Sequence, residues 1–90
     1  MIARKVSPAL AAGCTIVVKP AEATPLCAIE IFKILEEAGI PGGVANLITA
    51  LDPAPIGEEL LHNPKVRKLT FTGSTEVGKH LFRGAAEQLK

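Results

Sequence analysis

Apolar residues follow two different patterns along this chain of 90 residues, and the patterns alternate. Four segments are predicted to be helices, with apolar positions recurring every three or four residues along the longer ones: 2–12, 24–38, 56–62 and 74–89. Three short segments between them favour strands: 14–19, 44–49 and 67–72. Because the first of these strands is β-branched and apolar without polar alternation, we expect it to be buried on both faces, as in a parallel sheet.

Glycine and proline mark the expected ends of these helices. Gly13 is expected to end the first helix, and Pro8, which lacks a backbone donor, is expected to kink it. Thr24 is expected to cap the second helix, with Pro25 at the first helical position, where a missing donor costs nothing. Gly39 is expected to end that helix.

The order of these elements predicts an α/β fold. A helix comes first and the order βαβαβα follows, so that the two helices between strands are crossovers in a parallel sheet. We therefore expect a Rossmann-like parallel sheet, in which ligands bind beyond the carboxyl ends of the strands. No internal repeat, low-complexity tract or linker divides the chain.

Composition excludes several classes of protein. The net charge of +1 and the content of three Phe, no Trp and no Tyr argue against a nucleic-acid-binding protein. No apolar run is long enough to span a membrane. Without a secretory signal, Cys14 and Cys27 are expected to be reduced thiols in the cytoplasm, or in the mitochondrial matrix if the source is eukaryotic. His62 and His80 stand apart, so no metal site is expected.

The residues that follow the third predicted strand are a candidate anion-binding site. Gly73 and Ser74 follow this strand and open the last predicted helix, whose free N–H groups favour an anion such as a phosphate. Gly73 would let a ligand approach the backbone, and Gly78, one turn later, would let something pack against the helix. The alternative is that Ser74 only caps the helix, and the residues alone favour that structural role.

The first predicted strand ends in a cation and a carboxylate, Lys19 and Glu22. Both groups can bind ribose hydroxyls at the edge of a parallel sheet. They could equally form a surface ion pair of little energetic value. Neither a G-x-G-x-x-G nor a G-x-x-x-x-G-K-[ST] motif is present, so the pattern indicates a nucleotide without identifying it.

Four motifs in this order carry a resemblance to a known family. They are PALAAGCT at 8–15, KPAE at 19–22 followed by TPL at 24–26, EAGIP at 37–41 and FTGSTEVG at 71–78. Together they resemble the cofactor-binding part of the aldehyde dehydrogenase superfamily. With IARKV at 2–6 and GCT at 13–15, the chain is most similar to the succinate-semialdehyde dehydrogenase branch.

The resemblance implies roles for matching residues in binding a dinucleotide cofactor. The segment that holds the adenosine ribose is implied to be Lys19, Pro20, Ala21 and Glu22. The segment that binds the pyrophosphate is implied to be Gly73, Ser74, Thr75, Glu76, Val77 and Gly78, with Val77 near the adenine. Gly42 is implied to line the adenine side, and Arg4 to lie near cofactor and substrate. A carboxylate at Glu22 would bind a free 2′-hydroxyl and repel a 2′-phosphate, which favours NAD and leaves NADP as the alternative.

The resemblance also implies an NAD(P)-dependent oxidation of an aldehyde, succinate semialdehyde first among the candidates, to a carboxylic acid by a homo-oligomeric enzyme. The family attacks the aldehyde with a cysteine thiolate, uses a glutamate to activate water and holds the oxyanion with an asparagine. No residue here matches these three, and Cys14 and Cys27 match other positions. Residues 1–90 are therefore expected to be a fragment of the NAD(P)-binding domain, inactive alone. The alternatives are a non-catalytic nucleotide-binding module and an inactive remnant.

Overall fold

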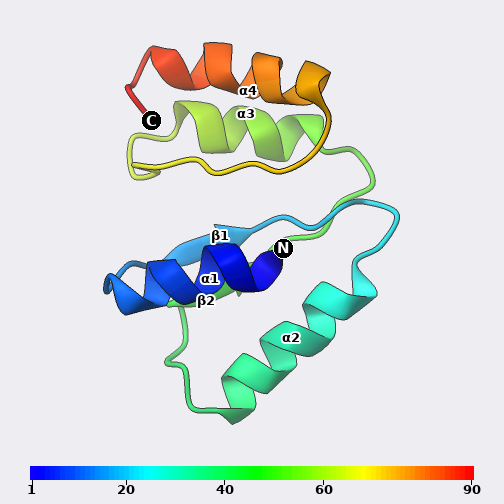
Figure 1. Ribbon diagram of the computed structural model, residues 1–90, viewed down its shortest axis with the longest axis vertical. Helices are drawn as coiled ribbons and strands as arrows, with labels where there is room; N and C mark the ends of the chain where they lie inside the picture. Colours follow the sequence, from blue (N-terminus) through cyan, green and yellow to red (C-terminus); the bar gives the residue numbers. More distant parts are fainter. The chain divides into compact units, whose positions relative to one another are not determined.

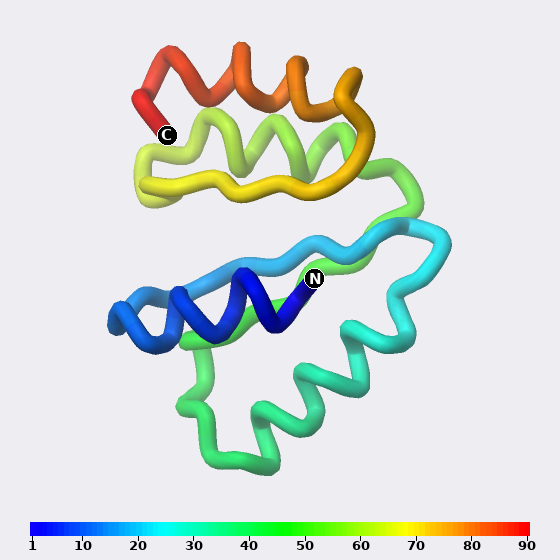
Figure 2. The backbone as a smooth tube through the Cα atoms, viewed as in Figure 1, coloured from blue at the N-terminus to red at the C-terminus, as the bar shows by residue number.

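The computed structural model describes all 90 residues and contains four helices and two strands (Figures 1 and 2). In chain order they are α1 (Ile2–Ala11), β1 (Ile16–Val18), α2 (Leu26–Glu37), β2 (Ala45–Leu47), α3 (Ala54–His62) and α4 (Thr75–Ala86). The chain divides into two compact units, Met1–Leu51 and Asp52–Lys90, and each is described by itself. No helix has both the length and the apolar character that crossing a membrane requires.

The first unit is a βαβ arrangement preceded by a helix (Figure 1). β1 and β2 are parallel, with Ile16 opposite Ala45 and Val18 opposite Leu47, and α2 is the crossover between them. The backbone N–H of Ile48 donates to the carbonyl of Val18 at 3.0 Å and so extends the ladder by one bond. The buried residues of this unit come from α1, β1 and α2: Val6, Val18 and Ala28. A parallel α/β arrangement is thus present, as the sequence predicted.

Both predicted glycine stops of this unit are confirmed. Gly13 and Gly39 have φ angles of 75° and 92°, the left-handed region that glycine adopts without steric cost. The N–H of Gly39 donates to the carbonyl of Glu36 at 3.0 Å, and the next N–H, of Ile40, donates to Leu35 at 3.1 Å. This pair of bonds is a Schellman motif, which satisfies carbonyls that the end of α2 leaves without helical partners.

The expected cap and start of α2 are wrong, whereas the helix expected at residues 2–12 is present and includes Pro8. α2 begins at Leu26 with Pro25 as its N-cap residue, and no side chain caps it, because Thr24 lies one residue too early and its own N–H donates to Ala21 in a turn. α1 continues through Pro8 to Ala11, since one missing donor removes one bond and the flanking turns remain helical.

Replacing Gly39 by alanine is expected to lower the free energy of unfolding by about 1 kcal/mol, because a Cβ is strained in the left-handed region. Gly57 is the matched control: it lies inside α3, and a Cβ built on it meets no atom within 4 Å. Gly57→Ala should therefore raise the free energy of unfolding by about 0.5–1 kcal/mol, the helix preference of alanine over glycine. Urea unfolding followed by circular dichroism measures both; equal signs for the two variants would contradict the assignment.

The second unit contains two packed helices and the extended chain between them (Figure 1). Leu61 of α3, only 2% exposed, lies against α4 at Gly84, where a built Cβ would be 2.7 Å from the Leu61 Cδ1 atom. Ala85 is the other buried apolar residue of this unit. Gly84 therefore lets the two helices approach closely enough to bury Leu61.

The third predicted strand, 67–72, is wrong: the segment is not assigned to a strand, and the sheet consists of β1 and β2 alone. A strand exists only through backbone pairing with a neighbour. The second unit, to which this segment belongs, contains only helices besides it. The composition of 67–72 suits a strand, but no strand of its own unit lies beside it.

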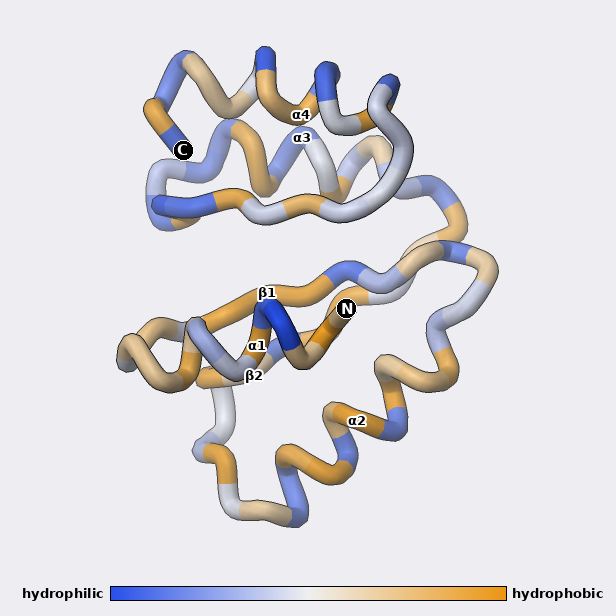
Figure 3. The backbone as a smooth tube through the Cα atoms, in the orientation of Figure 1, coloured by the Kyte–Doolittle hydropathy of each residue, from blue (hydrophilic) through white to orange (hydrophobic).

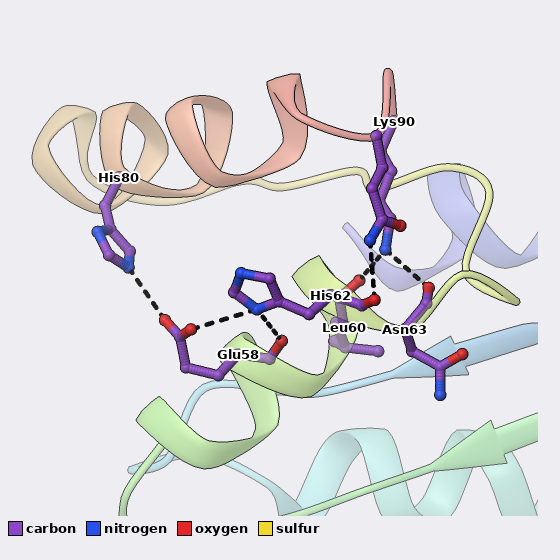
Figure 4. A network of polar contacts seen from close by, with 7 residues as sticks. Glu58, Leu60, His62, Asn63, His80 and Lys90 are labelled. Carbon is purple, nitrogen blue, oxygen red and sulfur yellow. Dashed lines mark hydrogen bonds and ion pairs between the residues drawn. The ribbon is translucent and has the colours of Figure 1, made fainter.

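Side chains that follow α4 hold the carboxyl end of α3 (Figure 4). Lys90 donates through Nζ to the carbonyls of Leu60 at 2.7 Å and Asn63 at 2.9 Å, and Gln88 donates to the carbonyl of His62 at 2.9 Å. These donors satisfy backbone acceptors that the end of a helix leaves open, and the cation of Lys90 complements the negative end of the helix dipole.

Apolar residues recur along both units (Figure 3), and several of their large side chains are exposed. The most exposed are Leu51, Leu89, Phe82, Leu26 and Met1. Only five apolar residues are buried in the whole chain. The stability of each unit therefore depends on a few well-packed side chains.

Candidate functional site

The segment that follows β1 brings a cation and a carboxylate together. Lys19 comes directly after the last residue of β1, and its Nζ donates to the carbonyl of Pro20 at 2.9 Å and to a carboxylate oxygen of Glu22. Ala21 accepts the N–H of Thr24 at 3.2 Å, which closes the turn. The Glu22 side chain remains 37% exposed and that of Lys19 23%. The predicted pairing at this strand end is therefore present, with both polar groups accessible to a ligand.

The Lys19 contact also sets the charge of the carboxylate. The hydrogen bond from Lys19 lowers the pKa of Glu22 below its ordinary value of 4.5, with a further contribution from the backbone N–H of Glu22 itself. Desolvation opposes this shift, and the Coulombic attraction of Lys19 supports it. The carboxylate is thus ionised at neutral pH and acts only as a hydrogen-bond acceptor.

Gly42 lies in the turn that leads into β2. The N–H of Val44 donates to the carbonyl of Pro41 at 3.2 Å across this turn, and Gly43 has a φ of 85°. Gly42 also lines an apolar groove of about 480 Å³ between α2 and β2, together with Phe32, Ile40 and Leu47 among others. The apolar lining suits a planar ring. None of the hydrogen bonds of this unit connects Gly42 with the Lys19–Glu22 turn.

Arg4 lies in the first turn of α1 and is exposed. None of the ion pairs of the chain includes it, and no hydrogen bond connects it to Lys19 or Glu22. The structure therefore leaves the Arg4 guanidinium available without joining it to the other candidate residues.

In the second unit, Ser74 is the N-cap residue of α4. Its φ and ψ are −68° and 150°, and its Oγ accepts the backbone N–H of Val77 at 3.3 Å. The capping role is thus confirmed, and it does not exclude an anion, because the Ser74 hydroxyl hydrogen and the first N–H groups of the helix are not used by the cap. Glu76 adds a negative charge to this first turn, where it complements the helix dipole.

Residues around this helix start line an open groove of about 500 Å³. Its lining comprises two hydroxyl residues, two glycines, two phenyl rings and two cations: Ser74, Thr75, Gly73, Gly78, Phe71, Phe82, Lys79 and Arg83. Val77, on the same turn, is 48% exposed. The groove combines hydroxyl donors, cations and apolar surface, the groups that bind a phosphorylated ring compound.

The two thiols and the two imidazoles of the chain lie apart from the candidate binding residues in its hydrogen bonds and ion pairs. Cys14 and Cys27 are free and exposed thiols, and the one hydrogen bond of Cys14 is a long contact of 4.0 Å to the carbonyl of Ala12. Glu58 lies between His62 and His80, with nitrogen–oxygen distances of 3.3 and 3.7 Å (Figure 4), but no group of three ligands could hold a metal ion.

Comparison with known proteins identifies the family. The profile described as "Aldehyde dehydrogenase family" matches residues 1–90, the whole chain. The chain belongs to the aldehyde dehydrogenase family. The resemblance carried by the four sequence motifs is therefore confirmed.

Two relatives show the similarity within this family. A probable succinate-semialdehyde dehydrogenase of Sinorhizobium fredii, whose name gives NADP(+), is 59% identical over 90 residues, covering 100% of this chain and 18% of that protein. A glutarate-semialdehyde dehydrogenase of Pseudomonas aeruginosa is 52% identical with the same coverage. The chain thus spans about 18% of the length of the curated relatives it matches.

Solved aldehyde dehydrogenase structures contain the same fold. An aldehyde dehydrogenase from Brucella melitensis biovar abortus superposes with a TM-score of 0.96 at 52% identity, covering 99% of this chain and 18% of that one. A betaine aldehyde dehydrogenase from Staphylococcus aureus, solved in complex with NAD+, gives a TM-score of 0.89 at 41% identity, covering 96% of this chain and 17% of that one. The α/β, Rossmann-like class is confirmed, with two strands inside this chain in place of three.

Asn46 supports the turn that carries Gly42, and the sequence analysis did not identify it. From the middle of β2, its Nδ2 donates to the carbonyl of Gly43 at 2.9 Å and to that of Ile16 at 3.3 Å. It therefore ties the turn that carries Gly42 to the start of β1. The available signal was a single amide side chain within an otherwise apolar strand segment.

Proposed function

We propose that residues 1–90 are part of the NAD(P)-binding domain of an enzyme that oxidises succinate semialdehyde to a carboxylic acid. The observation that carries this proposal is the identity of 49–59% with succinate- and glutarate-semialdehyde dehydrogenases along all 90 residues. One relative is a mitochondrial enzyme of Arabidopsis thaliana, and another is a bacterial enzyme of Escherichia coli. These two relatives support a location in the cytoplasm or in the mitochondrial matrix. We also propose that the whole enzyme is a homo-oligomer.

The Lys19–Glu22 turn is proposed to bind the adenosine ribose. The ionised, exposed carboxylate of Glu22 can accept the ribose hydroxyl hydrogens, and Lys19 Nζ can donate to a hydroxyl oxygen. Pro20 and Ala21 form the turn that holds these two groups together. A negative acceptor at this position supports NAD over NADP, since it repels a 2′-phosphate.

The start of α4, Gly73–Gly78, is proposed to bind the pyrophosphate. Ser74 accepts the N–H of Val77 and can at the same time donate its own hydrogen to a phosphate oxygen, beside the free N–H groups of Thr75 and Glu76. Val77, with its exposed apolar surface, is proposed to lie near the adenine. Gly42 is proposed to be a residue that lines the adenine side. Arg4 is proposed to lie near the cofactor and substrate.

These residues bind and orient; they do not carry the reaction. When bound, NAD accepts the hydride that leaves the substrate. The hydroxyl, carboxylate and ammonium groups above hold the adenosine and pyrophosphate, which fixes the cofactor through parts that do not react. Since neither thiol has a base beside it in its hydrogen bonds, the 90 residues alone are proposed to be inactive.

Calorimetric titration of NAD into the 90-residue chain tests the proposal. We expect binding with a Kd below about 1 mM, which corresponds to about −4 kcal/mol, and no formation of NADH when succinate semialdehyde is added. Binding without turnover also agrees with a stand-alone nucleotide-binding module. The full-length sequence of the source gene would distinguish such a module from a part of a larger enzyme. A Kd above that value favours an inactive remnant, and aldehyde-dependent NADH formation would contradict the proposed inactivity.

A further inference from the structure

The phenyl ring of Phe71 covers the two glycines at the start of α4. A Cβ built on Gly73 would lie 2.6 Å from the Phe71 Cζ atom and 3.1 Å from Cε2. A Cβ built on Gly78, one turn further along, would lie 3.5 Å from Cε1 of the same ring. One side chain therefore occupies the space that two side chains would otherwise take.

The backbone conformation at these positions does not itself require glycine. The glycines with φ in the left-handed region are Gly13, Gly39 and Gly43, and neither Gly73 nor Gly78 is among them. A Cβ at Gly73 would force the Phe71 ring to move from its position, because a separation of 2.6 Å is far below a normal contact between carbon atoms. The glycine at position 73 is thus explained by Phe71.

The ring contact takes the place of a hydrophobic staple. In the usual staple, an apolar residue just before the N-cap packs against the fourth residue of the helix and fixes the angle at which the chain joins it. Here the N-cap is Ser74, the fourth helical residue is Gly78, and the apolar residue in contact with it is Phe71. The capping box is incomplete, because Val77 stands where a glutamate or glutamine would complete it.

We propose that Phe71 is a positioning residue for the proposed pyrophosphate site and that Gly73 and Gly78 form the seat of its ring. The seated ring fixes the path of residues 71–74 on the first turn of α4. It thereby sets where the Ser74 hydroxyl and the first N–H groups of the helix point. This inference rests on the proposed function for its ligand, but the ring seat itself does not depend on any ligand.

A competing explanation is that Gly73 is small so that a phosphate can approach its backbone. If Gly73 is small so that a phosphate can approach its backbone, an added methyl group harms binding whatever residue occupies position 71. If Gly73 is small to seat the ring, shortening residue 71 makes room for the methyl group again. Phe71→Leu removes the ring atoms nearest to Gly73, so the double variant separates the two explanations.

The experiment compares the chain with its Gly73→Ala, Phe71→Leu and Phe71→Leu/Gly73→Ala variants, and with Gly57→Ala as the control. Hydrogen exchange at the Val77 amide reports on the Ser74 cap without any ligand, and NAD titration reports on the site. Gly73→Ala should speed Val77 exchange and weaken NAD binding, each about tenfold, by the cap and single-interaction energies typical of helices. Gly57→Ala should leave NAD binding within about twofold and should not speed Val77 exchange, because it stabilises the same unit.

The double variant decides the outcome. We expect its Val77 exchange and NAD affinity to return to the values of Phe71→Leu alone, within about twofold, because the two substitutions act on one contact. If Gly73→Ala worsens both values in the Phe71→Leu background by the same factor as in the unaltered chain, the ring seat is overturned. If the unaltered chain does not bind NAD, the proposed function fails, while the exchange rates still decide whether the ring seat exists.

Discussion

Replacing Glu22 by glutamine is expected to weaken NAD binding about tenfold and to strengthen NADP binding about tenfold. Glutamine has nearly the same size and keeps one acceptor oxygen, so the variant removes the charge and replaces the second carboxylate oxygen by an amide donor. A hydrogen bond to an ionised acceptor contributes about 1.5–3 kcal/mol, against about 0.5–1.5 kcal/mol for a neutral pair, and that difference corresponds to about tenfold in Kd. For NADP, the substitution removes a repulsion between the carboxylate and the 2′-phosphate.

The pH dependence of NAD binding provides a second measurement on the same residue. Because Lys19 lowers the pKa of Glu22, the carboxylate stays ionised as the pH falls to 5. The contribution of Glu22 to binding should therefore be complete above pH 4.5 and be lost only as the pH falls through the lowered pKa. Lys19→Met should raise this pKa, which an NMR titration of the Glu22 carboxyl group measures.

Glu30 provides the matched control for the charge. It pairs with Lys33 at 3.0 Å with the same spacing of three residues as Lys19 and Glu22, and it is exposed on α2. Glu30→Gln should leave both affinities unchanged within about twofold, because exposed ion pairs contribute little. Several relatives carry NADP(+) in their names. If the unaltered chain binds NADP more tightly than NAD, or Glu22→Gln changes neither affinity, Glu22 does not select the cofactor.

Helix ends could be predicted from the sequence because they depend on neighbouring residues. A left-handed glycine and the two bonds that follow it end α2 at Gly39, and every group involved lies within six residues. The segment 67–72 has an equally clear local preference for a strand, yet the structure contains no strand there. A strand requires a distant partner, and no local pattern shows whether that partner lies beside it.

The candidate site shows the same division. Lys19 and Glu22 could be paired from the sequence, since they are three residues apart at a strand end. The two bonds of Asn46 could not, because one of its acceptors, Ile16, is 30 residues away. For Gly73 the sequence indicated only that a side chain is absent, and the structure shows that Phe71 fills the space. The sequence therefore indicated that position 73 is small, but it did not indicate which side chain lies against it.

Leu61→Ala is expected to have the largest effect on stability, a loss of about 2–5 kcal/mol in the free energy of unfolding of the second unit. Leu61 is the one large side chain that is almost completely buried, at 2% exposure, and its Cδ atoms lie against α4 at Gly84. Removing three carbon atoms there loses their burial and leaves a cavity that the two helices cannot fill without moving closer.

Phe82→Ala is the matched control, since it removes a larger apolar side chain from the same unit. Phe82 is 79% exposed, so little buried surface is lost and the free energy of unfolding should change by less than about 0.5 kcal/mol. Urea unfolding followed by circular dichroism measures both variants. Similar losses for the two would show that Leu61 does not hold α3 against α4.

Leu61→Ala is also expected to weaken NAD binding, because the proposed pyrophosphate site lies at the start of α4. The position of α4 is fixed near its carboxyl end, at Gly84, by Leu61, and beyond that end by Lys90 and Gln88, which bind the last carbonyls of α3. Once the packing at Leu61 is lost, α4 is held against α3 mainly by these hydrogen bonds, which act only at its carboxyl end and leave the helix start less well fixed. NAD binding should therefore fall together with stability in Leu61→Ala, while an unchanged NMR titration of Glu22 would show that the first unit is still folded.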